Sequence, residues 1–404
     1  MPELPLSGVR VLDLTWYTAG PYCTRLLADY GADVLKIERP RVGDPSRQMP
    51  PFYKDQPGLE RSGLFLYLNT SKRSMTLDLK TARGKEVLKE LVRKADVLVE
   101  NFSPHVLPSL GLDYKTFRQL NPHLVMTSIS NFGQSGPYRD WKGSDLTIYG
   151  MGGPMINTGH PDHEPLMIAR HVPSFHVGAT ASAATSIALY GAETNGEGDH
   201  LDVTYFETLM GTIDRRSGNL LSFQYSGETS TRGVFGASPG SGIWPCADGY
   251  FFTTVLANRF TAMARMIGAE HLLTDPKWAT PAARSNPERV DEFAEMVIAW
   301  MIERTKKQVR AECDKFGVYG GPINTVSDVL DDEHFTARSF FQRIEHPTTG
   351  AITYPGYSFK LHLDEPAPPR RRAPLLGEHT DQVLRDELGL SAREAKELRT
   401  QGVV

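Results

Sequence analysis

The stretch VRVLDLTWYTAGPYCTRLLADYGADVLKIE, residues 9–38, decides the fold. It starts with a short apolar strand at 9–14, and the turn Ala19-Gly20-Pro21 follows. Residues 22–30 have the leucine spacing of a helix, and residues 33–38 have the apolar content of a second strand. A strand, a helix and a strand of these lengths predict a right-handed β-α-β unit with parallel strands.

The same alternation continues beyond this unit. Further strands are expected at 75–79, 96–100, 124–128 and 200–203, and further helices at 81–94, 114–120 and 179–189. Alternating elements of this length predict the α/β class, with a Rossmann-like, doubly wound parallel sheet. Such sheets bind ligands beyond the carboxyl ends of their strands, so the functional residues are expected there.

The composition changes after residue 215. Residues 217–242 are rich in glycine, serine and threonine, and residues 242–256 predict a β-hairpin that turns at Ala247-Asp248-Gly249. Helices are expected at 258–267, 290–303 and 306–316. We therefore predict a large α/β domain over 1–215, a small α+β domain over 216–321, and a return segment over 322–404 that completes the large domain.

The composition excludes several classes of protein. The chain has 404 residues and a formal net charge of −4, without the basic excess of nucleic-acid-binding domains. Its longest apolar stretches, such as 182–189, are far shorter than the roughly 20 residues that span a bilayer. The N-terminus has no leader pattern, and three widely spaced cysteines suit neither a disulfide framework nor a zinc site. We expect a cytoplasmic protein without nucleic-acid, membrane or metal partners.

Four motifs carry a family resemblance. They are Gly31-Ala-Asp-Val-Leu-Lys-Ile-Glu-Arg-Pro40, Asn69-Thr-Ser-Lys-Arg-Ser74, Ala95-Asp-Val-Leu-Val-Glu-Asn-Phe102 and Asn131-Phe-Gly-Gln-Ser-Gly-Pro137. In this order and spacing they resemble the class III CoA-transferases, the CaiB/BaiF family of formyl-CoA:oxalate and carnitine CoA-transferases. The resemblance runs from Leu6 to Thr380. It implies an interlaced dimer, in which each subunit is a ring threaded through the other and CoA lies at the domain interface.

The resemblance also implies a site for CoA or acyl-CoA, bound as substrate. Carried over position by position, the CoA-binding residues are Tyr17, Thr18, Arg39, Leu77, Lys80, Asn101, Phe102 and Lys142. The three cations among them suit the phosphate groups of CoA. A family arginine is replaced here by Ser109, and the glycine-rich run 236–242 predicts either a lid over the active site or a surface linker.

Ser174 departs from the family pattern. The segment His171-Val-Pro-Ser-Phe-His-Val-Gly178 resembles the family's active-site segment. There, a carboxylate four residues before the glycine attacks the acyl-CoA and carries the acyl group as a mixed anhydride. A serine cannot replace it as nucleophile without a base, for which His171 and His176 are the neighbouring candidates. The sequence leaves three roles open for Ser174: helix N-cap, substrate contact or nucleophile.

A second family reaction, racemisation of 2-methylacyl-CoA, is excluded by the residues present. It needs a histidine and an aspartate on either side of the α-carbon. Those two positions hold Ser144 and Ser174 in this chain.

Two functional hypotheses follow. In the first, this chain is the aspartate-less subunit of a heteromeric class III CoA-transferase, and a related aspartate-bearing subunit supplies the catalytic carboxylate. That pattern resembles the succinyl-CoA:(R)-benzylsuccinate CoA-transferases, which move CoA from succinyl-CoA to an aryl-succinate. In the second, the chain is a stand-alone CoA-thioester-binding protein, or a lyase or isomerase that uses His171 or His176 as base.

Overall fold

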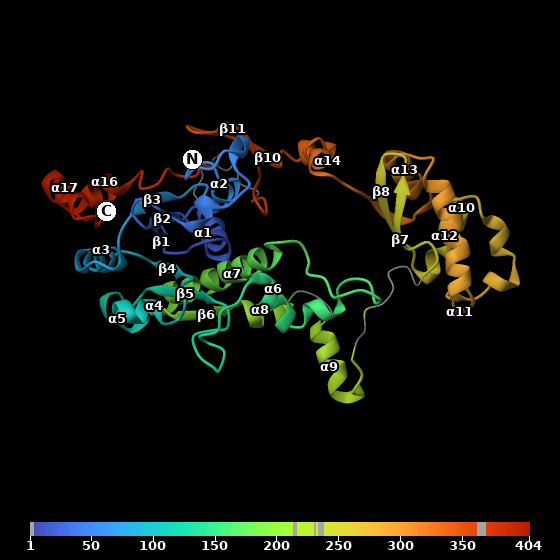
Figure 1. The fold of residues 1–404 in the computed structure, drawn as a ribbon, viewed down its shortest axis with the longest axis horizontal. Helices are drawn as coiled ribbons and strands as arrows, with labels where there is room; N and C mark the ends of the chain where they lie inside the picture. The colour runs from blue at the N-terminus through green and yellow to red at the C-terminus, as the bar shows by residue number, and fades with distance from the viewer. Residues whose placement is uncertain (1–3, 213–215, 230–231, 233–237, 362–368) are drawn as a thin grey trace. The chain divides into compact units, whose positions relative to one another are not determined.

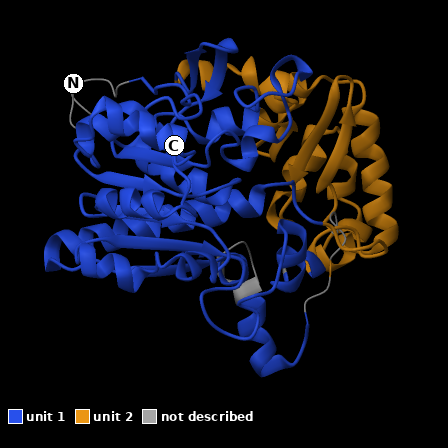
Figure 2. Ribbon diagram, turned by 60° about the vertical axis from the view of Figure 1, so that its left-hand side comes forward, with its two compact units in different colours: residues 1–156, 167–229, 339–404 blue, residues 157–166, 230–338 orange. Residues whose placement is uncertain are grey.

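The computed structural model describes residues 4–212, 216–229, 232, 238–361 and 369–404 of the chain (Figure 1). The chain divides into two compact units (Figure 2). Unit 1 consists of residues 1–156, 167–229 and 339–404, and unit 2 consists of residues 157–166 and 230–338. The domain division at residues 215 and 321 stays a prediction.

Unit 1 is built on a parallel sheet, in which the described residues form six strands in the order β3-β2-β1-β4-β5-β6. The strands are β1 (Arg10–Asp13), β2 (Asp33–Glu38), β3 (Arg73–Thr76), β4 (Val97–Glu100), β5 (Val125–Ser130) and β6 (His200–Thr204). Every neighbouring pair is parallel, so the predicted α/β class and parallel sheet are confirmed. The strand order reverses between β1 and β4, and ligands of such sheets bind at this switch point.

Both faces of this sheet are covered by helices. Val11 of β1 belongs to an apolar cluster with α1 (Ala19–Asp29) and α7 (Val172–Asn195). Its neighbour Leu12 belongs to the cluster on the other face, with α3 (Ala82–Val92), α5 (Tyr114–Leu120) and α17 (Ala392–Thr400). Successive side chains of a strand point to opposite faces, and burial of both faces explains why apolar residues follow one another directly in β1, β2 and β4.

Unit 1 contains several shorter elements around this sheet. The helices are α2 (Gly63–Leu68), α4 (Val106–Leu110), α6 (Asp145–Met151), α8 (Tyr205–Thr212), α9 (Arg216–Ser226) and α16 (Thr380–Gln382). A separate hairpin consists of β10 (Phe341–His346) and β11 (Gly350–Pro355). No helix in the described part of the chain is long and apolar enough to cross a membrane.

Unit 2 combines an antiparallel sheet with helices. Its strands are β7 (Gly242–Cys246), β8 (Gly249–Thr254) and β9 (Tyr319–Ile323), and its longer helices are α10 (Phe260–Met266), α12 (Pro287–Met301) and α13 (Lys306–Phe316). The predicted hairpin and its turn are confirmed. Buried aromatic side chains such as Phe251, Phe260 and Phe293 form its core.

Of the three roles that the sequence leaves open for Ser174, the helix N-cap is wrong. Helix α7 begins at Val172, and its N-cap residue is His171, whose side chain makes no capping hydrogen bond. Pro173 lies in the first turn, where a proline's fixed φ favours the helix and its missing N–H is no loss. The helix therefore begins three residues earlier than a serine cap at position 174 requires, and the Ser174 hydroxyl is directed elsewhere.

Candidate active site

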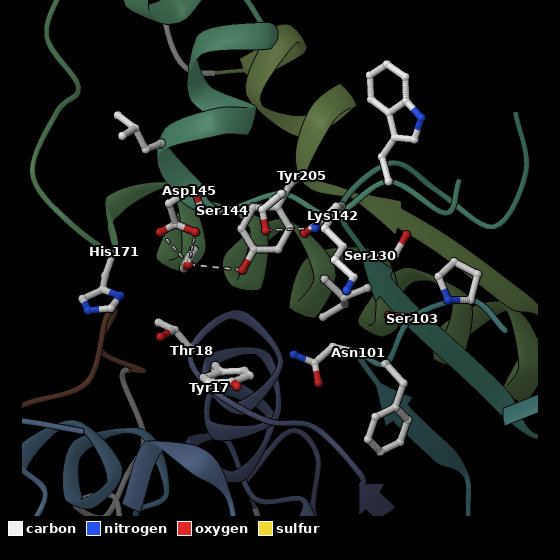
Figure 3. Close-up of a pocket in the computed structure, with 18 of the residues that line it drawn as sticks. Tyr17, Thr18, Asn101, Ser103, Ser130, Lys142, Ser144, Asp145, His171 and Tyr205 are labelled. Carbon is white, nitrogen blue, oxygen red and sulfur yellow. Dashed lines mark hydrogen bonds between the residues drawn. The ribbon is translucent and has the colours of Figure 1, made fainter. Parts of the chain in front are cut away.

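A cavity of about 890 Å³ lies in unit 1 at the carboxyl ends of β1, β4 and β5 (Figure 3). Its volume is in the range of small-molecule sites. Its walls come from the loops after these three strands and from the first turns of α6, α7 and α8. They include Tyr17, Thr18, residues 101–105, residues 129–131, residues 139–146, Met167, Arg170, His171, Ser174 and Tyr205.

Hydrogen bonds from neighbouring residues fix the loop after β1. Asn101 accepts a hydrogen bond from the Trp16 N–H and donates one to the Trp16 carbonyl, each 2.8 Å long. The fully buried Lys36 donates to the Thr15 carbonyl, and the Tyr17 N–H donates to Asp44. These contacts hold Tyr17 at a φ of 66°, a left-handed conformation that a tyrosine rarely adopts. The loop therefore presents Tyr17 and Thr18 to the cavity in a fixed geometry.

Five of the eight residues expected to bind CoA line this cavity: Tyr17, Thr18, Asn101, Phe102 and Lys142. Both polar groups of the Asn101 side chain are used on the backbone of Trp16, so Asn101 also holds the loop in place. The exposed side chain of Tyr17 and that of Phe102 add apolar surface to the wall.

The other three lie outside the cavity wall. Arg39 stacks on the ring of Trp16, with its guanidinium carbon 4.5 Å from the ring centre. Leu77 is buried in the core, and Lys80 is exposed at the turn before α3. Their role in CoA binding, like that of the five residues in the wall, stays a prediction. Ser109 is exposed, and its hydroxyl donates to the Val106 carbonyl.

Sequence reasoning missed two cations in the wall, Arg139 and Arg170. Among the described residues, the buried Nε of Arg139 has no hydrogen-bond partner. Arg170 is exposed and directly precedes the active-site segment, which was the available signal for it. Both can attract an anionic group of a ligand.

Ser174 lies in the cavity wall and is almost fully buried. Its Oγ donates to the Asp145 carboxylate, with distances of 3.0 Å to Oδ1 and 2.9 Å to Oδ2. The Tyr205 hydroxyl donates in turn to Ser174 Oγ over 3.1 Å. Figure 3 marks these hydrogen bonds with dashed lines that reach the labelled Asp145 and Tyr205. The chain of hydrogen bonds runs from α8 through α7 to α6. A carboxylate from another helix thus lies directly beside Ser174, the position at which the resemblance predicts a carboxylate.

Local sequence explains why Asp145 is placed there. Ser144 is the N-cap of α6 and accepts a hydrogen bond from the Thr147 N–H, so Asp145 is the first residue of the helix.

Burial raises the pKa of the Tyr205 phenol, and the nearby Asp145 raises it further, whereas the hydrogen bond with Ser174 lowers it. Tyr205 therefore keeps its proton at neutral pH and stays a donor to Ser174.

The two histidines of the segment are placed differently. His171 lines the cavity at a φ of 67°, whereas His176 is not among the lining residues. Burial lowers the pKa of both imidazoles; Arg170 lowers that of His171 further, and Asp145 opposes this. The lowered pKa favours the neutral form of both imidazoles, and His171 is the one positioned to meet a bound ligand.

Two further features bear on ligand binding. Among the described residues, no group of three or more His, Cys, Asp or Glu side chains could hold a metal ion. In the glycine-rich run, residues 236–237 lie outside the described residues, and the Ser238 and Ser241 hydroxyls donate to the Val255 carbonyl. A lid role for this run stays a prediction.

Known proteins resemble the chain over its full length. It is 33% identical to a succinyl-CoA–D-citramalate CoA-transferase of Chloroflexus aurantiacus, over 100% of this chain and 99% of that protein. It is 34% identical to a formyl-CoA:oxalate CoA-transferase of Afipia carboxidovorans, over 99% and 97%. The crystal structure of a CAIB/BAIF family protein from Brucella suis superposes with a TM-score of 0.84 at 31% identity, covering 96% of this chain and all of that one.

The family model for CoA-transferase family III matches residues 6–380. The matched residues cover nearly all of the chain, and the relatives named above align with it from end to end at 31–34% identity. The chain therefore belongs to CoA-transferase family III, whose activity moves CoA between acyl-CoA thioesters and carboxylic acids.

Proposed function

We propose that this chain transfers CoA from the acyl-CoA of a dicarboxylic acid, such as succinyl-CoA, to a second carboxylic acid. The observation that carries this proposal is the cavity of unit 1, which brings five expected CoA-binding residues together with the Ser174–Asp145 pair. A carboxylate in the wall of such a cavity suits acyl transfer, because a carboxylate can act as the nucleophile that forms a covalent intermediate.

Two observations favour a dicarboxylic substrate. The acyl-CoA of a dicarboxylic acid keeps one free carboxylate, which needs a cationic partner when it leaves water. Arg139 and Arg170 supply such partners in the wall, and a guanidinium can bind a carboxylate through two hydrogen bonds. The names of two relatives also include dicarboxylic acids: succinate and citramalate in one, oxalate in the other.

The assay for this proposal is direct. The purified full-length chain is incubated with succinyl-CoA and, in turn, with a panel of dicarboxylic and monocarboxylic acids, and new acyl-CoA products are measured by mass spectrometry. We expect transfer to dicarboxylic acids. Transfer only to monocarboxylic acids contradicts the assigned substrate class, and no transfer to any acid contradicts the proposed reaction.

Lys142→Ala is expected to weaken CoA binding about tenfold to a hundredfold, because a charge-assisted hydrogen bond contributes about 1.5–3 kcal/mol. Isothermal titration with CoA measures the change. Lys307→Ala, an exposed lysine of α13, removes the same charge far from the cavity residues in sequence and is the control. Arg39→Ala and Lys80→Ala test the two expected cations outside the wall. An unchanged isotherm for Lys142→Ala contradicts the proposed phosphate contact.

A second candidate is the heteromeric enzyme. In this version a related subunit supplies the aspartate, and CoA passes from succinyl-CoA to an aryl-succinate. The serine at position 174 favours it, and so do Tyr17, Phe102 and Trp141, which offer aromatic surface to an aryl group in the cavity. The test is the same assay on the chain alone and after co-expression with a related subunit that has an aspartate at this position. Transfer that requires the second subunit supports this candidate.

We also propose that the chain is an interlaced dimer, and the outer face of α7 supports this. Ala179, Ala183, Ile187 and Tyr190 lie along one exposed stripe of the helix. Ile187 and Tyr190 are 73% and 72% exposed, and exposed apolar stripes of this kind mark interfaces. A threaded ring would cover such a stripe and couple folding to association.

The double variant Ile187→Glu/Tyr190→Glu is expected to disrupt this dimer, because two carboxylates cannot be buried in an apolar interface without a large desolvation cost. Light scattering coupled to gel filtration measures the mass. Ile302→Glu, at an exposed apolar position that ends α12, is the control and should leave the mass unchanged. A wild-type chain that is monomeric at micromolar concentration contradicts the proposal.

A further inference from the structure

We propose that Asp145 is the carboxylate that carries the acyl group during CoA transfer, in place of the side chain that position 174 lacks. The inference rests on the proposed function and assigns a nucleophile to it. It makes the site of this single chain chemically complete.

The distances place the two side chains at one point of the cavity. Both carboxylate oxygens of Asp145 lie within 3.0 Å of Ser174 Oγ, and both residues line the cavity. An aspartate at position 174 would extend one atom farther from the backbone than serine does. Its oxygens would enter the space that the Asp145 carboxylate now occupies. The negative charge is therefore at nearly the same place, but it comes from α6 instead of α7.

The other carboxylate in the described part of the cavity wall is less suitable. Asp140 is exposed, and its Oδ1 lies 4.0 Å from Nδ1 of the exposed His105. It is not hydrogen-bonded to the active-site segment in the described structure. Asp145 is half-buried and is held by a hydroxyl of that segment.

The direction of the hydrogen bonds favours the carboxylate over the hydroxyl as nucleophile. Ser174 accepts a hydrogen bond from the Tyr205 hydroxyl and donates one to Asp145. One proton cannot occupy both carboxylate oxygens, so one oxygen of Asp145 always has a lone pair free for attack. A carboxylate holds a proton far more weakly than an alkoxide does, so Asp145 is a poor base for Ser174.

The chemistry of the intermediate points the same way. A serine ester is more stable than a thioester, so return of the acyl group to CoA would be uphill. An anhydride or a thioester of an aspartate keeps the acyl group activated at every step.

The steps balance without any further reactant. The Asp145 carboxylate attacks the thioester carbonyl, the C–S bond breaks, and CoA leaves as thiolate from a mixed anhydride. The thiolate attacks the Asp145 carbonyl and releases the first carboxylic acid as carboxylate, leaving an aspartyl-CoA thioester. The acceptor carboxylate attacks this thioester and again displaces the thiolate, which then attacks the acceptor's carbonyl. The products are the new acyl-CoA and the free Asp145 carboxylate.

The experiment locates the acyl carrier in the wild-type chain. The full-length protein is incubated with succinyl-CoA and then with hydroxylamine, which converts an aspartyl anhydride or aspartyl thioester into a hydroxamate. Peptide mass spectrometry locates the modified residue, with a sample lacking acyl-CoA as reference. We expect the hydroxamate on Asp145.

Variants supply the second measurement. Asp145→Asn should lose transfer by about three or more powers of ten and form no hydroxamate, as expected for removal of a nucleophile. Ser174→Ala should keep the hydroxamate on Asp145 and lower kcat while KM stays constant, because Ser174 positions the carboxylate. Asp291→Asn, in the exposed surface of α12, is the matched control and should leave transfer unchanged.

The outcomes separate this inference from the proposed function. CoA transfer with the hydroxamate on Ser174, on any other residue of this chain or on a co-expressed subunit overturns the role of Asp145 and leaves the function standing. Full transfer by folded Asp145→Asn does the same. Absence of transfer by the wild-type chain with every acid overturns both.

Discussion

Asp13→Ala is expected to lower the free energy of unfolding by about 3–5 kcal/mol, the cost of removing one partner from a buried ion pair. Asp13 is fully buried at the end of β1. It accepts hydrogen bonds from Thr15, Thr24 and the Lys72 ammonium group, which lies 2.9 Å away. Without the carboxylate, the equally buried Lys72 and Lys36 lose their common counter-charge.

The same substitution should also impair CoA transfer. Lys36 and Asp13 hold Thr15, and Thr15 begins the loop that presents Tyr17 and Thr18 to the cavity. Chemical denaturation monitored by circular dichroism measures the stability, with Asp291→Ala as the exposed control. Equal denaturation midpoints for Asp13→Ala and wild type would contradict a stabilising ion pair.

The pH dependence of stability tests the Asp13 ion pair with the conservative variant Asp13→Asn. Burial alone would raise the pKa of Asp13, but Lys36 and Lys72, with hydrogen bonds from Thr15 and Lys72, lower it from 3.8 to about 2. The ionised Asp13 therefore stabilises the fold fully at a pH above its pKa in the unfolded chain. This stabilisation is lost as the pH falls through its pKa in the folded chain. The stability gap between wild type and Asp13→Asn should narrow by about 2 kcal/mol between about pH 5 and about pH 2. A constant gap contradicts the assignment.

The sequence predicted the sheet well, because its signals are local. The predicted strand at 33–38 and the helices at 114–120 and 306–316 agree with β2, α5 and α13 to the residue. In each case the apolar pattern and the turn residues lie inside the segment that they describe. Side-chain alternation on β1 is also local: it sends the apolar Val11 and Leu12 to opposite faces, and helices cover each of them.

The active site was only partly predictable, because its key contact is not local. Asp145 and Ser174 are 29 residues apart, on different helices, and no periodic pattern connects them. The sequence identified Ser174 as the unusual residue and assigned no role to Asp145. It took the packing of α6, α7 and α8 to show that a carboxylate adjoins the serine. The buried pair Asp13–Lys72, 59 residues apart, escaped notice for the same reason.

Helices α1 and α7 pack closely next to this site, and a substitution at their contact is the second one expected to have a large effect on stability. Gly178 lies one turn after Ser174 on α7, and a Cβ there would be 2.5 Å from the carbonyl oxygen of Ala19 at the start of α1. Backbone cannot move aside as a flexible side chain can, so the two helices must separate. Gly178→Ala is therefore expected to destabilise the chain by about 1–3 kcal/mol. It should also reduce CoA transfer, because α7 carries Ser174 and Thr18 directly precedes α1.

Gly191→Ala on the same helix is the matched control for this prediction. A Cβ at Gly191 meets no atom within 4 Å, so only the intrinsic helix propensity changes there. Alanine is the better helix former, and this variant should gain up to about 1 kcal/mol. Thermal or chemical denaturation of both variants should thus give shifts of opposite sign, with transfer lowered only in Gly178→Ala. Stability shifts of the same sign and size in both variants would contradict this prediction. They would mean that the close approach of α7 to α1 does not depend on the missing side chain at Gly178. Other contacts would then set the position of Ser174.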